Sequence, residues 1–203
     1  IASNFLGVMF VALNTAVKGK GLLHQINTSK SKHVIVDNLF FDEVNDIKNN
    51  NKLDVKILNC SELKNKEIIN ENEVIFGKLS DNVCTMFTSG TSGPSKGVMM
   101  PNAHCVLFAI GTIENYDLKH DHVFYISLPL FHANGLFMQL LACIITGAKA
   151  IIRNRFSASN WLKDIRKYDV THTNMLGAIA AFVVAQPPSC LLYTSPSPRD
   201  AHK

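Results

Sequence analysis

Hydrophobic residues in the first sixty positions alternate between short unbroken runs and a helical spacing. The unbroken runs predict buried strands at 7–13, 33–37 and 53–59. The stretches between them repeat apolar side chains every three or four positions, which predicts helices over 20–29 and 38–49. Asn38 is the expected N-cap of the second helix. This order of strands and helices predicts a doubly wound, mostly parallel sheet.

The same alternation continues after residue 100. Strands are expected at 122–130, 148–153 and 170–176, and helices at 102–115, 134–146, 159–168 and 177–186. Asn102 and Asn134 can cap two of these helices, Ser157 or Ser159 can start a third, and Gly147 can stop the second. Residues 59–82 are polar, and we expect them to form a surface connection.

Composition narrows the class of protein. The chain has 203 residues, of which 47% are hydrophobic and 18% charged, as in one ordinary globular domain or a piece of a larger one. The net charge of +4 is spread along the chain, so a basic face for nucleic acid is not indicated. The five cysteines lack metal-ligand spacing, which favours reduced thiols in an intracellular protein. No apolar run approaches the ~20 residues of a membrane span.

Residues 85–100, TMFTSGTSGPSKGVMM, carry the clearest candidate chemistry. Two β-favouring runs enclose a loop of glycines and hydroxyl side chains, with one cation at Lys96. Glycine lets the backbone approach a ligand closely, while hydroxyls, backbone amides and an ammonium group all donate hydrogen bonds. Donors that converge in this way suit a polyphosphate.

Four familiar glycine-rich motifs do not fit this loop. A Walker A loop needs Ser or Thr after its lysine, but Gly97 follows Lys96. The Rossmann pattern lacks its first glycine, and GTSG closes one residue too early for a hydrolase elbow. The S-x-x-K pattern fails because Gly93 lies three residues before Lys96. The remaining interpretation is a nucleotide loop between two strands rather than at a helix N-terminus.

The segment FTSGTSGPSKGV resembles the AMP-binding signature of the acyl-adenylate-forming superfamily, [YF]-T-S-G-[ST]-T-G-x-P-K-G. It departs at Ser92, where threonine is usual, and at Pro94-Ser95, where a variable residue followed by proline is usual. PLFHANGL at 129–136 resembles the second signature of that family, P-x-F-H-x-x-G. The segment after Gly7 resembles G-A-V-x-V-P-x-N, with Ala12 in place of proline.

The resemblance covers residues 5–189 and implies an α/β fold. It would be part of the large N-terminal domain of an adenylate-forming enzyme, with layered, mostly parallel sheets and flanking helices. On this interpretation 1–189 form a partial AMP-binding domain and 190–203 a non-native tail, since the tail resembles translated adapter read-through. Ile1 in place of methionine also leads us to expect a fragment.

By resemblance, the parent enzyme activates a carboxylic acid as acyl-AMP and transfers it to CoA. ATP, Mg²⁺ and CoA would be required, in the cytoplasm. The stretch 155–189 is most similar to crotonobetaine/carnitine–CoA ligases and related enzymes of fatty-acid metabolism. The family pattern assigns phosphate binding to Thr88, Ser89, Gly90, Thr91, Ser92, Gly93, Ser95, Lys96 and Gly97. No metal ligand is assigned.

His132 would lie at the mouth of the acyl pocket and help to position the carboxylate, because imidazole donates hydrogen bonds and changes charge near pH 7. Phe131, Gly135 and Met138 could shape that pocket or belong to the core. His120, Asp121 and His122 resemble a metal cluster, but a solvated loop is favoured because they lie in a turn before a strand and lack a third ligand at a known spacing. His172 is interpreted as a hydrogen-bonded core histidine.

Two other functions stay open at this point. One is an adenylation domain that loads a carrier protein, and the other is a non-catalytic nucleotide-binding α/β protein. The sequence contains neither the family's Y-G-x-T-E segment nor its C-terminal catalytic lysine. We therefore expect this polypeptide by itself to bind triphosphate poorly and to be inactive.

Overall fold

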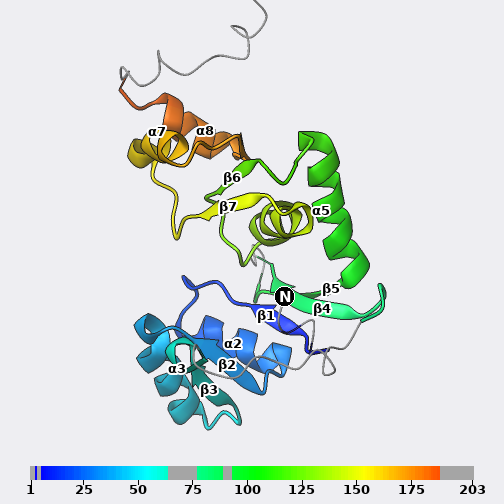
Figure 1. Ribbon diagram of the computed structural model, residues 1–203. Coiled ribbons are helices and arrows are strands. Elements are labelled where there is room, and N and C mark those ends of the chain that lie inside the picture. Colours follow the sequence, from blue (N-terminus) through cyan, green and yellow to red (C-terminus); the bar gives the residue numbers. More distant parts are fainter. Residues whose placement is uncertain (1–2, 4–5, 64–76, 89–92, 188–203) are drawn as a thin grey trace, which may run out of the picture. The chain divides into compact units, whose positions relative to one another are not determined.

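The computed structural model describes residues 3, 6–63, 77–88 and 93–187. The chain divides into two compact units, 1–105 and 106–203, and each is described by itself (Figure 1). The tail expected at 190–203 lies outside the described residues.

The first unit contains two small sheets instead of the single sheet predicted for its strands. In one sheet β4 (Asn82–Phe87) is central. It pairs in parallel with β1 (Phe10–Ala12) and antiparallel with β5 (Gly97–Pro101). The other sheet joins β2 (His33–Val36) and β3 (Lys56–Asn59) in parallel. The sequence placed β1 beside these two strands, but its hydrogen bonds go to β4, far along the chain.

Two helices pack with the β2–β3 sheet around a hydrophobic core. They are α2 (Gly19–Ser29) and α3 (Asn38–Asn51), and a short helix, α4 (Cys60–Leu63), follows β3. The buried members of this first core are Leu22, Ile26, Val34, Val36, Val44, Ile47 and Val55.

The predicted cap of α3 is wrong by one residue. Asp37 is the N-cap, with an extended backbone, and its carboxylate accepts a hydrogen bond of 3.0 Å from the Leu39 amide. Asn38 already belongs to the helix and instead accepts a hydrogen bond from the Asn59 side chain. An aspartate suits the cap for two reasons. Its oxygen accepts a hydrogen bond from a helix amide that has no partner within the helix, and its negative charge lies at the positive end of the helix dipole.

The second unit is built on a parallel sheet of order β7–β6–β8. Its strands are β6 (Val123–Ile126), β7 (Lys149–Ile152) and β8 (His172–Thr173). The helices are α5 (Asn102–Tyr116), which begins before the unit boundary, α6 (Ala142–Thr146), α7 (Ala158–Lys167) and α8 (Gly177–Val184). The second core comprises Ala109, Leu118, Phe124, Ile126, Ala142, Cys143 and Ala148.

The helix predicted over 134–146 is present but changes its winding. Residues Asn134–Leu141 form a π-helix, η2, which continues into α6. Asn134 is not the predicted cap, because it lies inside η2 and its side chain accepts a hydrogen bond from buried Gln139. The stop at Gly147 is confirmed, with φ of 76° in the left-handed region that glycine enters without strain.

An ionic cluster around the buried Asp164 joins α7 to the sheet. Asp164 of α7 is 7% exposed and accepts hydrogen bonds from Arg153 Nε (2.9 Å) and Tyr125 Oη (3.0 Å). The Arg153 guanidinium also pairs with the second carboxylate oxygen. Hydrogen bonding by Arg153 lowers the pKa of Asp164, and burial raises the pKa of Tyr125 to about 12, so the phenol donates.

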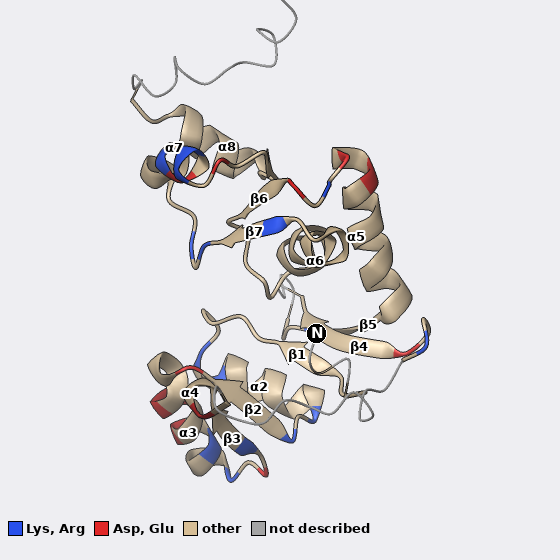
Figure 2. Cartoon of the chain, in the orientation of Figure 1, with Lys and Arg blue, Asp and Glu red and all other residues tan. Residues whose placement is uncertain are grey.

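Charged side chains are spread over helices, turns and strands of both units, as the sequence predicted (Figure 2). Within the described ranges, no helix is long and apolar enough to cross a membrane. The four cysteines of the described residues, Cys60, Cys84, Cys105 and Cys143, are free thiols.

Candidate phosphate-binding hairpin and associated residues

The glycine-rich loop joins the two antiparallel strands of a hairpin. Phe87 at the end of β4 is paired with Gly97 at the start of β5, so the loop lies between two strands, as predicted. Thr88 holds both backbone groups of Lys96: its amide donates to the Lys96 carbonyl (3.0 Å), and its hydroxyl accepts from the Lys96 amide (3.1 Å). These two bonds fix the base of the loop.

Lys96 presents its charge at this base. The residue is exposed and takes part in no ion pair with any other described residue. The sequence contains no acidic residue between Asp81 and Glu114. The ammonium group is therefore available to an anion, in a segment whose side chains add no negative charge.

Two of the loop's glycines are required by the backbone or by packing. Gly93 has φ of 154°, which a residue with a side chain rarely adopts. A Cβ atom on Gly97 would lie 2.9 Å from the Thr85 methyl group. The other predicted phosphate-binding residues, Ser89, Gly90, Thr91 and Ser92, lie outside the described residues.

Helix α2 holds the loop from the side through Ser95. His24 Nε2 lies 2.9 Å from the Ser95 carbonyl, and because a carbonyl only accepts, this ring nitrogen carries the donated proton. Gln25 Nε2 donates to the Ser95 hydroxyl at 3.3 Å. Neither residue was predicted from the sequence. The available signal was a polar residue, Gln25, on the face that also buries Leu22 and Ile26.

His132 lies in the second unit, in the turn between β6 and η2. It is exposed, its amide donates to the Pro129 carbonyl (3.2 Å), and its carbonyl accepts from the Leu136 amide (3.1 Å). Its ring contacts the Phe131 ring, with 4.6 Å between centroids. Phe131 and Met138 are half-buried and Gly135 is buried. The turn therefore holds the His132 backbone and leaves its imidazole accessible.

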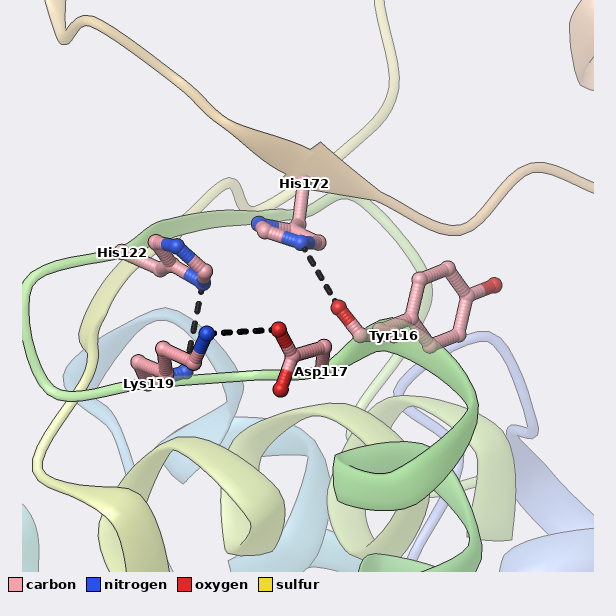
Figure 3. A network of polar contacts seen from close by, with 5 residues as sticks. All are labelled: Tyr116, Asp117, Lys119, His122 and His172. Atoms are coloured by element: carbon pink, nitrogen blue, oxygen red, sulfur yellow. Dashed lines mark hydrogen bonds and ion pairs between the residues drawn. The ribbon is translucent and has the colours of Figure 1, made fainter.

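His122, one of the two histidines at 120–122, belongs to a polar network (Figure 3). His122 Nδ1 accepts from the Lys119 amide at 3.2 Å, while Lys119 Nζ pairs with Asp117 at 2.6 Å and lowers the pKa of that carboxylate. His172 Nε2 donates to the Tyr116 carbonyl at 3.1 Å. The first two contacts lie within the turn, and the third joins the end of α5 to β8. No group of three His, Cys, Asp or Glu side chains suited to a metal occurs among the described residues.

His172 is hydrogen-bonded through both ring nitrogens, as interpreted from the sequence, but it is half-buried and does not belong to the core. Its Nδ1 lies 2.7 Å from the Thr171 hydroxyl, in addition to the Nε2 contact. Its ring is 4.5 Å from that of His122 and stacks on Phe124 at 6.2 Å. Packing and hydrogen bonds account for this residue.

Comparison with known proteins places these features in a family. The model of the family described as "AMP-binding enzyme" matches residues 1–198. Among curated relatives, the medium/long-chain-fatty-acid–CoA ligase FadD17 of Mycobacterium marinum is 27% identical over 92% of this chain and 36% of its own length. The 2-succinylbenzoate–CoA ligase of Bacillus licheniformis is 31% identical over 92% of this chain and 39% of its own length.

Solved structures agree with the fold. The o-succinylbenzoate CoA synthetase (MenE) of Bacillus subtilis, in complex with the acyl-adenylate intermediate OSB-AMP, has a TM-score of 0.79 at 29% identity, covering 93% of this chain and 48% of that one. ATP-bound MatB of Rhodopseudomonas palustris has a TM-score of 0.80 at 20% identity, covering 92% of this chain and 38% of that one. The α/β class expected from the sequence is thereby confirmed.

These matches extend over nearly all of the chain but over well under half of each curated relative described above. A family match of this extent, together with the hairpin loop and its single lysine, identifies the chain as a member of the AMP-binding enzyme family.

Proposed function

We propose that this chain is part of an AMP-forming acid–CoA ligase, which uses ATP to activate a carboxylic acid and then transfers the acyl group to CoA. The observation that carries the proposal is the β4–β5 hairpin, whose base presents the exposed Lys96 held by Thr88. The relatives with ligase names support the same reaction class.

The donor set of the hairpin fits a triphosphate. Its side chains supply hydroxyl groups and one ammonium group, and the segment between Asp81 and Glu114 contains no carboxylate. Phosphate oxygens accept hydrogen bonds and carry negative charge, so donors without neighbouring acids are the matching partners. We assign this role to Thr88, Ser89, Gly90, Thr91, Ser92, Gly93, Ser95, Lys96 and Gly97.

Catalysis of this reaction depends on aligning the carboxylate with the α-phosphorus and on neutralising the phosphate charge, more than on covalent catalysis. A carboxylate attacks the α-phosphorus, the bond to the bridging oxygen breaks, and pyrophosphate leaves with the electron pair. Lys96 and the loop donors would hold the β- and γ-phosphates and stabilise the charge that develops on the leaving group. In the second step the CoA thiol, as thiolate, displaces AMP from the acyl carbon.

His132 would orient the substrate carboxylate. Its accessible imidazole can donate a hydrogen bond to one carboxylate oxygen, while the turn holds its backbone. Phe131, Gly135 and Met138 would shape the site for the acid. Bound Mg²⁺ would neutralise phosphate charge, and we assign it no protein ligand within the described residues.

Narrower parts of the proposal rest on the sequence resemblance. These are a carnitine-like acid as substrate, a role in fatty-acid metabolism and a cytoplasmic location, the last supported by the free thiols. We also expect the 203-residue chain alone to be inactive. It lacks the adenine-stacking Y-G-x-T-E segment of the family.

The test is carboxylate-dependent ATP–pyrophosphate exchange by the protein from the complete reading frame, assayed over a panel of carboxylic acids. Lys96→Ala should lower exchange by about 10- to 100-fold, because one charged donor to the leaving group is lost. Lys56→Ala, an exposed lysine on β3, is the matched control and should retain activity. Unchanged exchange in Lys96→Ala would refute the assignment of the loop.

A further inference from the structure

We propose that His24 and Gln25 of α2 are positioning residues for the nucleotide loop, acting through Ser95 on the neighbouring Lys96. This inference rests on the proposed function, because it assigns the loop to ATP. The contacts that carry it are His24 Nε2 to the Ser95 carbonyl at 2.9 Å and Gln25 Nε2 to the Ser95 hydroxyl at 3.3 Å.

The two contacts restrain Ser95 in complementary ways. His24 binds a backbone group, so it fixes the peptide that joins Ser95 to Lys96. Gln25 binds the side chain of the same residue and limits its rotation. On the other side, Thr88 holds the amide and the carbonyl of Lys96. The backbone of Lys96 is therefore restrained from both sides, and its side chain extends from a fixed position.

Burial of Gln25 points to a role beyond packing. The residue is 3% exposed, and its Oε1 is buried with no hydrogen-bond partner among the described residues. A buried amide with an unpaired oxygen is destabilising, and an apolar side chain among Leu22 and Ile26 would avoid that cost. The compensating contact is the one to Ser95.

His24 is oriented by its own helix. Its Nδ1 lies 3.5 Å from the hydroxyl of Thr28, one turn further along α2. With Nε2 committed as the donor to Ser95, Nδ1 is the ring nitrogen that faces this hydroxyl. The ring is thereby directed toward the loop rather than left free to rotate.

Positioning predicts a selective kinetic effect. A restrained Lys96 binds phosphate with less loss of conformational freedom, so releasing it should weaken ATP and pyrophosphate binding and leave the carboxylic acid unaffected. Loss of one such hydrogen bond corresponds to about a three- to tenfold change. A merely structural role would instead reduce the amount of folded enzyme and leave every KM unchanged.

The experiment compares His24→Phe and Gln25→Met in the complete protein by ATP–pyrophosphate exchange. Each should raise the KM for ATP about three- to tenfold, with the KM for the acid unchanged. His24→Gln keeps a donor on the side chain and should recover most of the wild-type value. Asn27→Ala, exposed on the same helix, is the matched control.

A double-mutant cycle completes the test. If α2 acts through Lys96, His24→Phe should change the KM for ATP by less than about twofold in a Lys96→Ala background. Additive effects would overturn the inference, as would an unchanged KM for ATP in both single variants. Absence of exchange in the wild type would refute the proposed function and this inference with it. Exchange that depends on Lys96 but not on α2 would refute this inference alone.

Discussion

Gly135 follows His132 at a point where the backbone leaves no room for a side chain. A Cβ atom there would lie 2.5 Å from the Pro129 carbonyl oxygen and 2.8 Å from that of Leu128. Both obstacles are backbone atoms in the turn that presents His132, so they cannot move aside by rotating a side chain. The glycine is needed for the close approach of two backbone segments.

Gly135→Ala should therefore lower the free energy of unfolding by about 1 to 3 kcal/mol, the usual cost of overpacking. Gly111→Ala is the matched control, because its Cβ would meet no atom within 4 Å inside α5. This control should raise stability by about 0.5 to 1 kcal/mol through helix propensity. Urea unfolding of both variants is the measurement, and equal effects would contradict the steric argument.

At the scale of elements, the N-terminus of α3 is capped by a single polar side chain. Asp37 caps α3 through the Leu39 amide, whereas Asn38, the cap expected from the sequence, contacts Asn59. We expect Asp37→Ala to destabilise the protein by about 1 kcal/mol and Asp37→Asn to be nearly neutral, since asparagine is an equally good cap. The comparison is made by thermal unfolding, and a loss in Asp37→Asn as large as that in Asp37→Ala would disprove the capping role.

The contact of α7 with the sheet should depend on pH through Asp164. Its pKa is lowered in the folded protein, chiefly by hydrogen bonding from Arg153, so the ionised form stabilises the fold. That stabilisation is complete above the unfolded pKa of about 3.9 and is lost as the pH falls through the lower folded value.

Asp164→Asn should accordingly cost about 2 to 3 kcal/mol near pH 7. The difference from wild type should shrink as the pH falls below about 4, where the wild-type carboxylate begins to be protonated. Denaturant unfolding at several pH values measures this. Asp42→Asn, exposed on α3, should change stability by less than about 0.5 kcal/mol, and a pH-independent effect of Asp164→Asn would oppose the prediction.

The sequence predicted most of these elements but not how they pair. The helix stop at Gly147 and the loop between β4 and β5 follow from local rules, which concern glycine conformation and a contiguous motif. The pairing of β1 with β4 joins Phe10 to Cys84, and no local turn encodes a parallel contact of that separation.

In the candidate site too, the residues of local motifs were predicted and the contacts between distant positions were not. Lys96 and His132 stand in motifs and were predicted, although their roles remain proposals. The contacts of His24 and Gln25 with Ser95 connect positions about 70 residues apart, so spacing could not reveal them. The sequence also did not predict the π-helical winding of Asn134–Leu141, because the apolar pattern of this segment fits an ordinary α-helix equally well.

At the scale of the whole molecule, each unit has a hydrophobic core of its own. Ile26 is 2% exposed in the first core and Ile126 is fully buried in the second. Cores formed from separate residues give each unit its own source of stability.

We expect Ile26→Ala to speed hydrogen exchange of the α2 and β2 amides far more than that of β6, since about 2 to 4 kcal/mol is lost locally. Ile126→Ala should give the reverse pattern. Native-state hydrogen exchange followed by mass spectrometry tests both, and uniform acceleration across the chain would indicate a single cooperative unit instead.

The two bonds between Thr88 and Lys96 have a consequence for engineering. They close the hairpin with one hydroxyl and backbone groups and use no side chain of residues 89–94. With Gly93 retained for its φ of 154°, residues 89–94 can thus be exchanged with the matching stretch of a relative or randomised in a library. Selection from such libraries would then change how the loop binds phosphate, while the register between β4 and β5 stays fixed.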